Sequence, residues 1–306
     1  MLLTRRLRRL RRLRRLAAGV AAAALGAVAA CTTDSTAPAS SGSNNSALSA
    51  PEASLLGEAV AADAQSVLDG ATLSGGLFLP GLAAPIAPFA SGTAFCMPTR
   101  SPSPPANSDA DPVPDSVRIA FSACAFASAT EADTVRGAID IVDPTPTTTD
   151  RSVKTVFTDF SWVHVRDGRR RSLELNGTRE AIRDASVISL IEKDFRSTYT
   201  FPDGSTSSHD RTWNSTFTAA TPGSIQPDAP LPSGTLSIDG TSTWTRGTNT
   251  YSLAVSTDPV LHFNAACTVR PKFDAGTLHV TVTRGSTASN VTIAFTACGQ
   301  YTVTRS

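Results

Sequence analysis

The sequence of 306 residues has few lysines, few aromatic side chains and none of the short motifs that mark common enzyme classes. Its three lysines are Lys154, Lys193 and Lys272, and aromatic residues make up 6% of the chain. A G-x-S-x-G elbow, an H-E-x-x-H helix and a phosphate-binding glycine loop are all missing. These absences exclude enzymes that depend on such motifs, whereas a hydrolase whose residues meet only in the fold stays open.

The chain also lacks an apolar run that is long enough for a membrane-spanning helix. The run at 16–30 has about fifteen residues, and a spanning helix needs about twenty. Eight arginines at 5–15 precede this run, and Cys31 follows it. A basic segment, an apolar segment and small residues in this order are typical of a cleaved signal peptide, which we expect at 1–30.

The residues Val28, Ala29, Ala30 and Cys31 resemble the lipobox of bacterial lipoproteins, in which the cysteine thiol receives a lipid before the signal peptide is cut. We therefore expect acyl chains on Cys31 to hold the mature chain at a membrane. Thr32 stands where an aspartate commonly retains lipoproteins in the inner membrane, so we expect the outer membrane, on its periplasmic or its cell-surface face. The alternatives are an ordinary secretory signal and an arginine block that binds nucleic acid or an acidic membrane surface.

Loss of the signal peptide changes the net charge from +1 to about −7, because the 27 basic side chains fall to 19 against 26 acidic ones. No basic surface then remains to neutralise phosphates, so we expect no nucleic-acid partner. Residues 31–50 are small and polar, and they predict a flexible tether between the lipid and the folded part.

Residues 51–70 predict one short helix, with a proline at its start and a glycine at its end. The following segment, 71–115, is rich in proline and glycine and predicts loops. Its oxygen-bearing residues Asn107, Asp109 and Asp111 alternate, together with Asp115, like the ligands of a calcium loop. Because such a loop needs a glycine that is missing here, and two prolines interrupt the segment, we expect a solvated loop and no metal.

Residues 116–306 alternate apolar and polar side chains in short runs rich in β-branched residues. This period of two predicts an all-β domain, a large antiparallel meander of roughly ten to twelve strands. Frequent threonine and serine predict one wet face. A sheet of this size must curl or form two layers, so a curved sheet or half-barrel and a sandwich both stay open. Turns are predicted at Asp167-Gly168, Asp203-Gly204, Arg246-Gly247 and Arg284-Gly285.

Four cysteines remain besides Cys31, and an even number in an oxidising compartment predicts disulfides. No two are close enough for a C-x₂₋₄-C zinc pair or a C-x-x-C redox pair. The stretches "VRIAFSAC" at 117–124 and "VTIAFTAC" at 291–298 end two similar segments. Strict alternation places each terminal cysteine on the polar face, opposite the Ile and Phe of its segment. Three pairings are possible, and the repeat favours Cys96–Cys124 and Cys267–Cys298.

His209 and Asp210 are the best acid–base candidates in the sequence, but adjacent strand residues point to opposite faces and do not bond to each other. The other histidines, His164, His262 and His279, are expected on strand faces. We predict no catalytic residue, no cofactor and no metal ligand, and a protein that is more consistent with a non-enzyme. We expect five aromatic side chains to pack in the core or across strands, and these are Trp162, Trp213, Trp244, Tyr199 and Tyr251. The alternative is that they line a carbohydrate- or lipid-binding surface.

The end of the chain, with "GTLHVTVTRG" at 276–285 and "VTIAF" at 291–295 between Cys267 and Cys298, resembles a group of uncharacterised bacterial outer-membrane lipoproteins. Looser likeness extends over most of 115–306. The resemblance implies a secreted β-rich domain and brings no activity with it. We therefore predict a membrane-anchored envelope lipoprotein that acts as a non-catalytic binding or structural module. A carrier for lipid or acyl chains and a hydrolase of envelope polymers are the alternatives.

Overall fold

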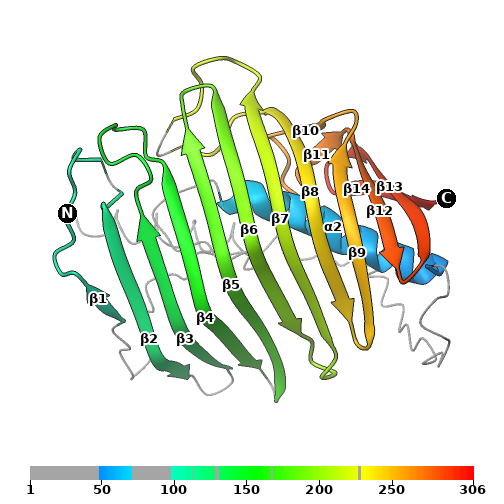
Figure 1. Ribbon diagram of the computed structural model, residues 1–306, viewed down its shortest axis with the longest axis horizontal. Helices are drawn as coiled ribbons and strands as arrows, with labels where there is room; N and C mark the ends of the chain where they lie inside the picture. Colours follow the sequence, from blue (N-terminus) through cyan, green and yellow to red (C-terminus); the bar gives the residue numbers. More distant parts are fainter. Residues whose placement is uncertain (1–47, 71–97, 112, 128–130, 167, 227–228) are drawn as a thin grey trace, which may run out of the picture. The chain divides into compact units, whose positions relative to one another are not determined.

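The described residues form one antiparallel sheet of 14 strands that is not closed, with helix α2 (Ala50–Gly70) against one face (Figure 1). The predicted all-β meander with one helix is therefore confirmed, as a single sheet and not as the two layers of a sandwich. The computed structural model describes residues 48–70, 98–111, 113–127, 131–166, 168–226 and 229–306, all within the unit Ser43–Ser306. The strands are β1 (Thr99–Ser101), β2 (Ser116–Ala127), β3 (Glu131–Val142), β4 (Val153–Arg166), β5 (Arg169–Arg183), β6 (Val187–Thr200), β7 (Thr206–Ala219), β8 (Gly234–Arg246), β9 (Asn249–Thr257), β10 (Leu261–Phe263), β11 (Phe273–Ala275), β12 (Thr277–Arg284), β13 (Thr287–Ala297) and β14 (Gln300–Arg305).

Neighbouring strands follow the chain order from β1 to β9, and β12, β13 and β14 continue the sheet beyond β9. The short strands β10 and β11 leave this path, with β10 paired to β8. The predicted turn glycines join consecutive strands, and Gly204 and Gly247 have φ values of 81° and 58°, which favour glycine. Asp167 of the first predicted turn lies outside the described residues.

Helix α2 begins with a capping box and buries one side against the sheet. The Ser49 backbone N–H donates to the Glu52 carboxylate (2.9 Å), and the Glu52 N–H donates to the Ser49 hydroxyl (3.4 Å). Leu56, Val60 and Leu68 are fully buried in a core that includes side chains of β7 to β9 and β12 to β14. No helix in the described part of the chain is both long and apolar enough to cross a membrane.

A second apolar cluster lies on β2 to β6, which form the other half of the sheet. Its rings meet edge to face: Phe157 is 6.0 Å from Phe160 and 5.7 Å from Phe195, measured between ring centroids. The two clusters give every long strand an apolar face, and this explains why the period of two predicted the strands.

Strands β2, β4 and β6 each contain a bulge near the middle. Ala123, Asp159 and Asp194 have φ values of 52°, 46° and 49° there, and the strand register shifts beside each of them. The neighbouring strands supply glycines, because an added Cβ at Gly137 or Gly177 would overlap the carbonyl oxygen of Asp159 or Asp194. The three bulges lie in the stretches "FSAC", "FTDF" and "EKDF", of which only the first belongs to the repeat described in the sequence.

The bulge in β2 corrects the predicted position of Cys124. Strict alternation places this cysteine on the polar face, but the extra residue turns it to the apolar face, where it is 4% exposed within the second cluster. Cys124 is disulfide-bonded. Its predicted partner Cys96 lies outside the described residues, so that pairing stays a prediction.

Candidate functional site

The structure places His209 and Asp210 on opposite faces of β7. Asp210 lies on the solvent face, where its carboxylate accepts a hydrogen bond from the Arg196 guanidinium (Oδ2 to Nη2, 2.6 Å). His209 is 4% exposed and faces helix α2. The two candidates therefore do not form an acid–base pair, and the chemistry of His209 depends on its neighbours under the helix.

His209 bridges a carboxylate and a hydroxyl that come from two other elements. Its Nδ1 bonds to Asp63 of α2, and its Nε2 lies 2.9 Å from the Ser242 hydroxyl of β8. Asp63 and Ser242 lie 146 and 33 residues away in the sequence. The order of contacts, hydroxyl to imidazole to carboxylate, is that of a Ser–His–Asp triad.

Two arginines and a second carboxylate complete this buried site. Arg211 of β7 pairs with Asp63 and with Glu192 of β6 (Nε to Oε2, 2.9 Å). Arg179 of β5 donates to Glu192 (Nε to Oε1, 2.7 Å) and to the Ser66 hydroxyl of α2 (3.1 Å). Helix α2 is thus joined directly to β5 and β7, and through their arginines to β6, by charged contacts that are shielded from water. Such contacts are strong if every charge is paired.

The charges of this site balance only when the imidazole is neutral, because two arginines face two carboxylates. Burial lowers the pKa of His209 from 6.5 to about 4, against the attraction of Glu192 and Asp210, which raises it. Because a carboxylate only accepts hydrogen bonds, Nδ1 carries the proton toward Asp63 and Nε2 accepts from Ser242. Burial also lowers the pKa of Arg211 to about 9 and raises that of Glu192.

The sequence carried one local signal for this site, which is the place of Asp63 on helix α2. Leu56, Val60, Asp63 and Val67 recur at helical spacing, so the acid occupies the apolar stripe of the helix. A carboxylate in such a position needs a buried partner. The identity of the partners depends on the fold and has no local signal.

The Ser242 hydroxyl lies inside the core, because this residue is 7% exposed and faces α2. Its neighbours Thr241 and Thr243 point to the opposite, solvent face. The contact of His209 with Asp63 helps to hold the helix over this hydroxyl.

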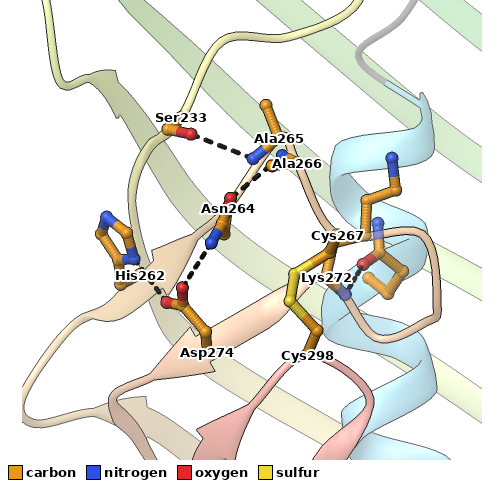
Figure 2. The surroundings of a disulfide bond; sticks show 10 residues. Ser233, His262, Asn264, Ala265, Ala266, Cys267, Lys272, Asp274 and Cys298 are labelled. Carbon is orange, nitrogen blue, oxygen red and sulfur yellow. Dashed lines mark hydrogen bonds and ion pairs between the residues drawn. A yellow bond between two sulfur atoms is a disulfide. The ribbon is translucent and has the colours of Figure 1, made fainter.

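The disulfide Cys267–Cys298, which confirms the predicted pairing, lies next to the C-terminal half of α2 (Figure 2). Its Cα atoms are 5.6 Å apart. The bridge ties the loop that follows β10 to the turn after β13. In this loop the Lys272 backbone N–H donates to Gln65 of the helix (2.7 Å). The disulfide therefore fixes a loop that holds helix α2.

Side chains beside the disulfide hold the same loop (Figure 2). Asp274 bonds to His262 (Oδ1 to Nδ1, 2.5 Å) and to Asn264 (Oδ2 to Nδ2, 2.6 Å), and Asn264 accepts from the Ala266 N–H (2.9 Å). Burial raises the pKa of Asp274, but the hydrogen bonds from His262 and Asn264 outweigh it and hold the pKa below the usual value. These contacts explain His262 as a structural residue.

The remaining histidines lie on strands, in contacts that stabilise neighbouring segments. His164 bonds to Asp133 (Nδ1 to Oδ1, 2.9 Å) and stacks on Trp162. His279 donates from Nε2 to the carbonyl oxygen of Asp258 (2.8 Å).

The aromatic side chains do not form a binding surface on the second half of the sheet. Trp213, Trp244 and Tyr251 are fully buried in the core beneath α2, which confirms the packing interpretation for these three. Trp162 and Tyr199 are partly buried against the second apolar cluster.

The solvent face of β7, β8, β9 and β12 carries a hollow of about 480 Å³. Thr212 of β7 lies opposite Thr241 of β8. This agrees with the solvent-exposed face that the frequent threonine and serine predicted. Asp194 and Asp210 add two carboxylates to the lining. We call the hydroxyl-bearing residues of this hollow that point to solvent the hydroxyl face, and they are Thr212, Thr241, Thr243, Ser252, Thr281 and Thr283.

Comparison of the chain with protein-family models, with curated proteins and with solved structures finds no match.

The pKa of His209 makes stability depend on pH. Between pH 6.5 and about 4 the unfolded chain binds a proton on this histidine and the folded chain does not, so the free energy of unfolding falls as the pH falls. From pH 7 to pH 5 we expect the wild type to lose about 2 kcal/mol more than His209→Gln, at about 1.4 kcal/mol per pH unit in this window. Urea unfolding at both pH values measures the difference.

His279→Gln is the matched control for this measurement, because His279 lies on the solvent side and bonds only to a backbone carbonyl in the described structure. It should keep the pH dependence of the wild type. Equal pH dependence in the wild type and His209→Gln would show that His209 is not held neutral by burial.

Proposed function

We propose that the protein is a lipid-anchored, non-catalytic module of the bacterial envelope that binds a glycan on its hydroxyl face. The observation that carries this proposal is the hollow on the solvent side of the sheet, to which four strands contribute hydroxyl side chains. Helix α2 covers the opposite face of the same strands. The face that remains open to a ligand is therefore the one with the hollow.

The lining of the hollow favours a sugar chain over an anionic ligand. Among its described lining residues are two carboxylates, Asp194 and Asp210, and no basic side chain. Arg196 beside the hollow is paired with Asp210, so the lining itself offers no cation to a phosphate-rich ligand. Threonine and serine hydroxyls both donate and accept hydrogen bonds, as the hydroxyls of a glycan do. Neighbouring strands repeat these groups at about 4.8 Å, so a polymer has several contacts along the sheet.

The membrane anchor rests on the sequence, because Cys31 and the signal peptide lie outside the described residues. The arginine block, the apolar run and the lipobox-like residues before Cys31 support lipidation, and the small polar residues after it support a tether. The resemblance to outer-membrane lipoproteins supports an envelope location.

The packing beneath α2 disfavours the alternative of an acyl-chain carrier. A carrier needs a continuous apolar groove, but Leu56, Phe217 and Phe273 are fully buried between the helix and the sheet. In the described part of the chain this apolar face is therefore filled by the protein itself.

One observation favours a second candidate, a hydrolase, which is the distance of 2.9 Å between the Ser242 hydroxyl and His209 Nε2. With Asp63 on Nδ1, the three groups have the contacts that activate a serine nucleophile. Because Ser242 is buried, this candidate requires a state in which α2 moves away from β8.

Lipidation of Cys31 predicts a covalent mark that a single substitution removes. In bacterial cells fed an alkyne analogue of palmitate, the wild type should be labelled and should sediment with membranes. Cys31→Ser should be unlabelled and should leave the membrane fraction, because the tether then has no acyl chain. Label on Cys31→Ser, or wild type without label, would contradict the lipobox interpretation.

Glycan binding is tested by sedimentation of the protein with purified peptidoglycan sacculi. Thr241→Val with Thr281→Val keeps the shape of the side chains but removes two hydroxyls of the hydroxyl face. We expect the affinity to fall by about tenfold or more, since each hydrogen bond contributes about 1 kcal/mol. The control, Thr216→Val with Thr302→Val, changes exposed threonines outside the hollow and should bind like the wild type. Failure of the wild type to sediment, or equal binding by all forms, would reject this face as the site.

The hydrolase candidate predicts covalent labelling by a fluorophosphonate probe, which reacts with activated serines. The wild type should be labelled, and Ser242→Ala and His209→Gln should not. Ser252→Ala serves as the control, because Ser252 lies on the solvent face and has no histidine partner in the described structure. An unlabelled wild type would remove this candidate.

A further inference from the structure

Three carboxylates meet where the loop before β2 approaches the loop after β3. Asp109 and Asp111 come from the first loop, and Asp143 comes from the second. One carboxylate oxygen from each residue lies within 4.8 Å of the others. Like charges at this separation repel one another unless something positive lies between them.

Hydrogen bonds hold part of this cluster and leave the rest free. Asp111 accepts from the backbone N–H of Val113 (2.6 Å) and of Arg151 (2.9 Å), and Asp143 Oδ1 accepts from the Thr145 N–H (2.8 Å). The two loops are joined directly, since the Asp143 N–H donates to the carbonyl oxygen of Asp115 (3.2 Å). The carboxylates are therefore positioned before any ligand arrives.

The independent sign of a ligand is a buried oxygen without a partner. Asp143 is 4% exposed, and its Oδ2 is buried with no hydrogen-bond partner. Oδ2 of Asp109 is in the same condition. Buried carboxylate oxygens in proteins are nearly always paired, and leaving one unpaired costs free energy. Among the described residues, no Lys, Arg or His forms an ion pair with Asp109, Asp111 or Asp143.

We propose that Asp109, Asp111 and Asp143 bind a calcium ion. The ligands are all oxygens, which excludes a preference for zinc, and the set comes from two irregular loops. Calcium accepts six to eight oxygens in flexible geometry and completes its shell with backbone carbonyls and water, whereas magnesium demands a near-ideal octahedron. The sequence alone does not predict this site, because the glycine that a calcium loop needs is missing and two prolines interrupt the segment. The structure differs because the third ligand, Asp143, comes from another loop.

The ion would join the segment before β2 to the connection between β3 and β4. Both loops belong to the first half of the sheet, which carries the second apolar cluster. Calcium that binds only the folded chain stabilises it by mass action. The site is independent of the hydroxyl face, which lies on β7, β8, β9 and β12.

The test uses the full-length protein after treatment with EDTA. Calcium chloride or magnesium chloride is added in isothermal titration calorimetry and in thermal unfolding. We expect one calcium per chain and a rise of several degrees in the unfolding midpoint, with a much smaller effect of magnesium. Asp143→Asn should weaken calcium binding by at least about tenfold, because one of three charged ligands is lost. Without calcium, this variant should be at least as stable as the wild type, since the substitution removes a buried like charge.

Asp203→Asn is the matched control, because Asp203 also accepts hydrogen bonds from a turn, at Ser205, but lies exposed and away from the cluster. It should bind calcium like the wild type. The proposal would be overturned if calcium gave the wild type neither a heat of binding nor a rise in the unfolding midpoint. Unchanged binding by Asp143→Asn, or an equal response to magnesium, would overturn it as well.

Discussion

The arrangement of this protein depends on one buried carboxylate, that of Asp63, which is shared by Arg211 and His209. An aspartate inside a core is tolerated only when its charge is paired and its oxygens are bonded. Here both oxygens are used, one by each partner, and the partners stand two residues apart on the same face of β7. The pairing fixes where α2 lies along the sheet and which of its sides faces the core.

Two further contacts prevent rotation of the helix about this point. At its start, Glu52 accepts a hydrogen bond from the Tyr251 hydroxyl (2.5 Å) of β9. Burial raises the pKa of Glu52, but the hydrogen bonds from Ser49 and Tyr251 outweigh it and keep the carboxyl ionised. At its end, Asp69 pairs with Arg270 in the loop that the Cys267–Cys298 disulfide ties to the turn after β13. Helix α2 is therefore held at both ends and at the middle, and the core beneath it is closed.

The sequence predicted the parts of this structure that depend on local order. A period of two in the strands, turn glycines and a short helix with a glycine at its end are signals contained within a few residues. The bulges were missed because Asp159 and Asp194 look like ordinary outward-facing polar residues, and only their glycine neighbours on adjacent strands accommodate the positive φ. This is also why the position of Cys124 was wrong.

The contacts of the candidate site escaped prediction for a different reason. His209 was noticed, but its partners Asp63 and Ser242 are separated from it by 146 and 33 residues, and a single sequence carries no information on such pairs. The adjacent Asp210 was the plausible partner in sequence and belongs to the other face of the sheet. A residue next to His209 in the sequence therefore points to the opposite face of the strand. The residues that contact its imidazole come from α2 and β8.

The two faces of the second half of the sheet consequently have different roles. Helix α2 takes the apolar face, with its charged contacts concealed in the core, so that the solvent face is left with small hydroxyl side chains. If Cys31 carries the lipid, as proposed, the tether leads along the chain to the Ser49 capping box, next to Glu52 and its contact with β9. A pull from the membrane then acts on the N-terminal end of a helix that is held at three points, and it does not act on the edge of a strand.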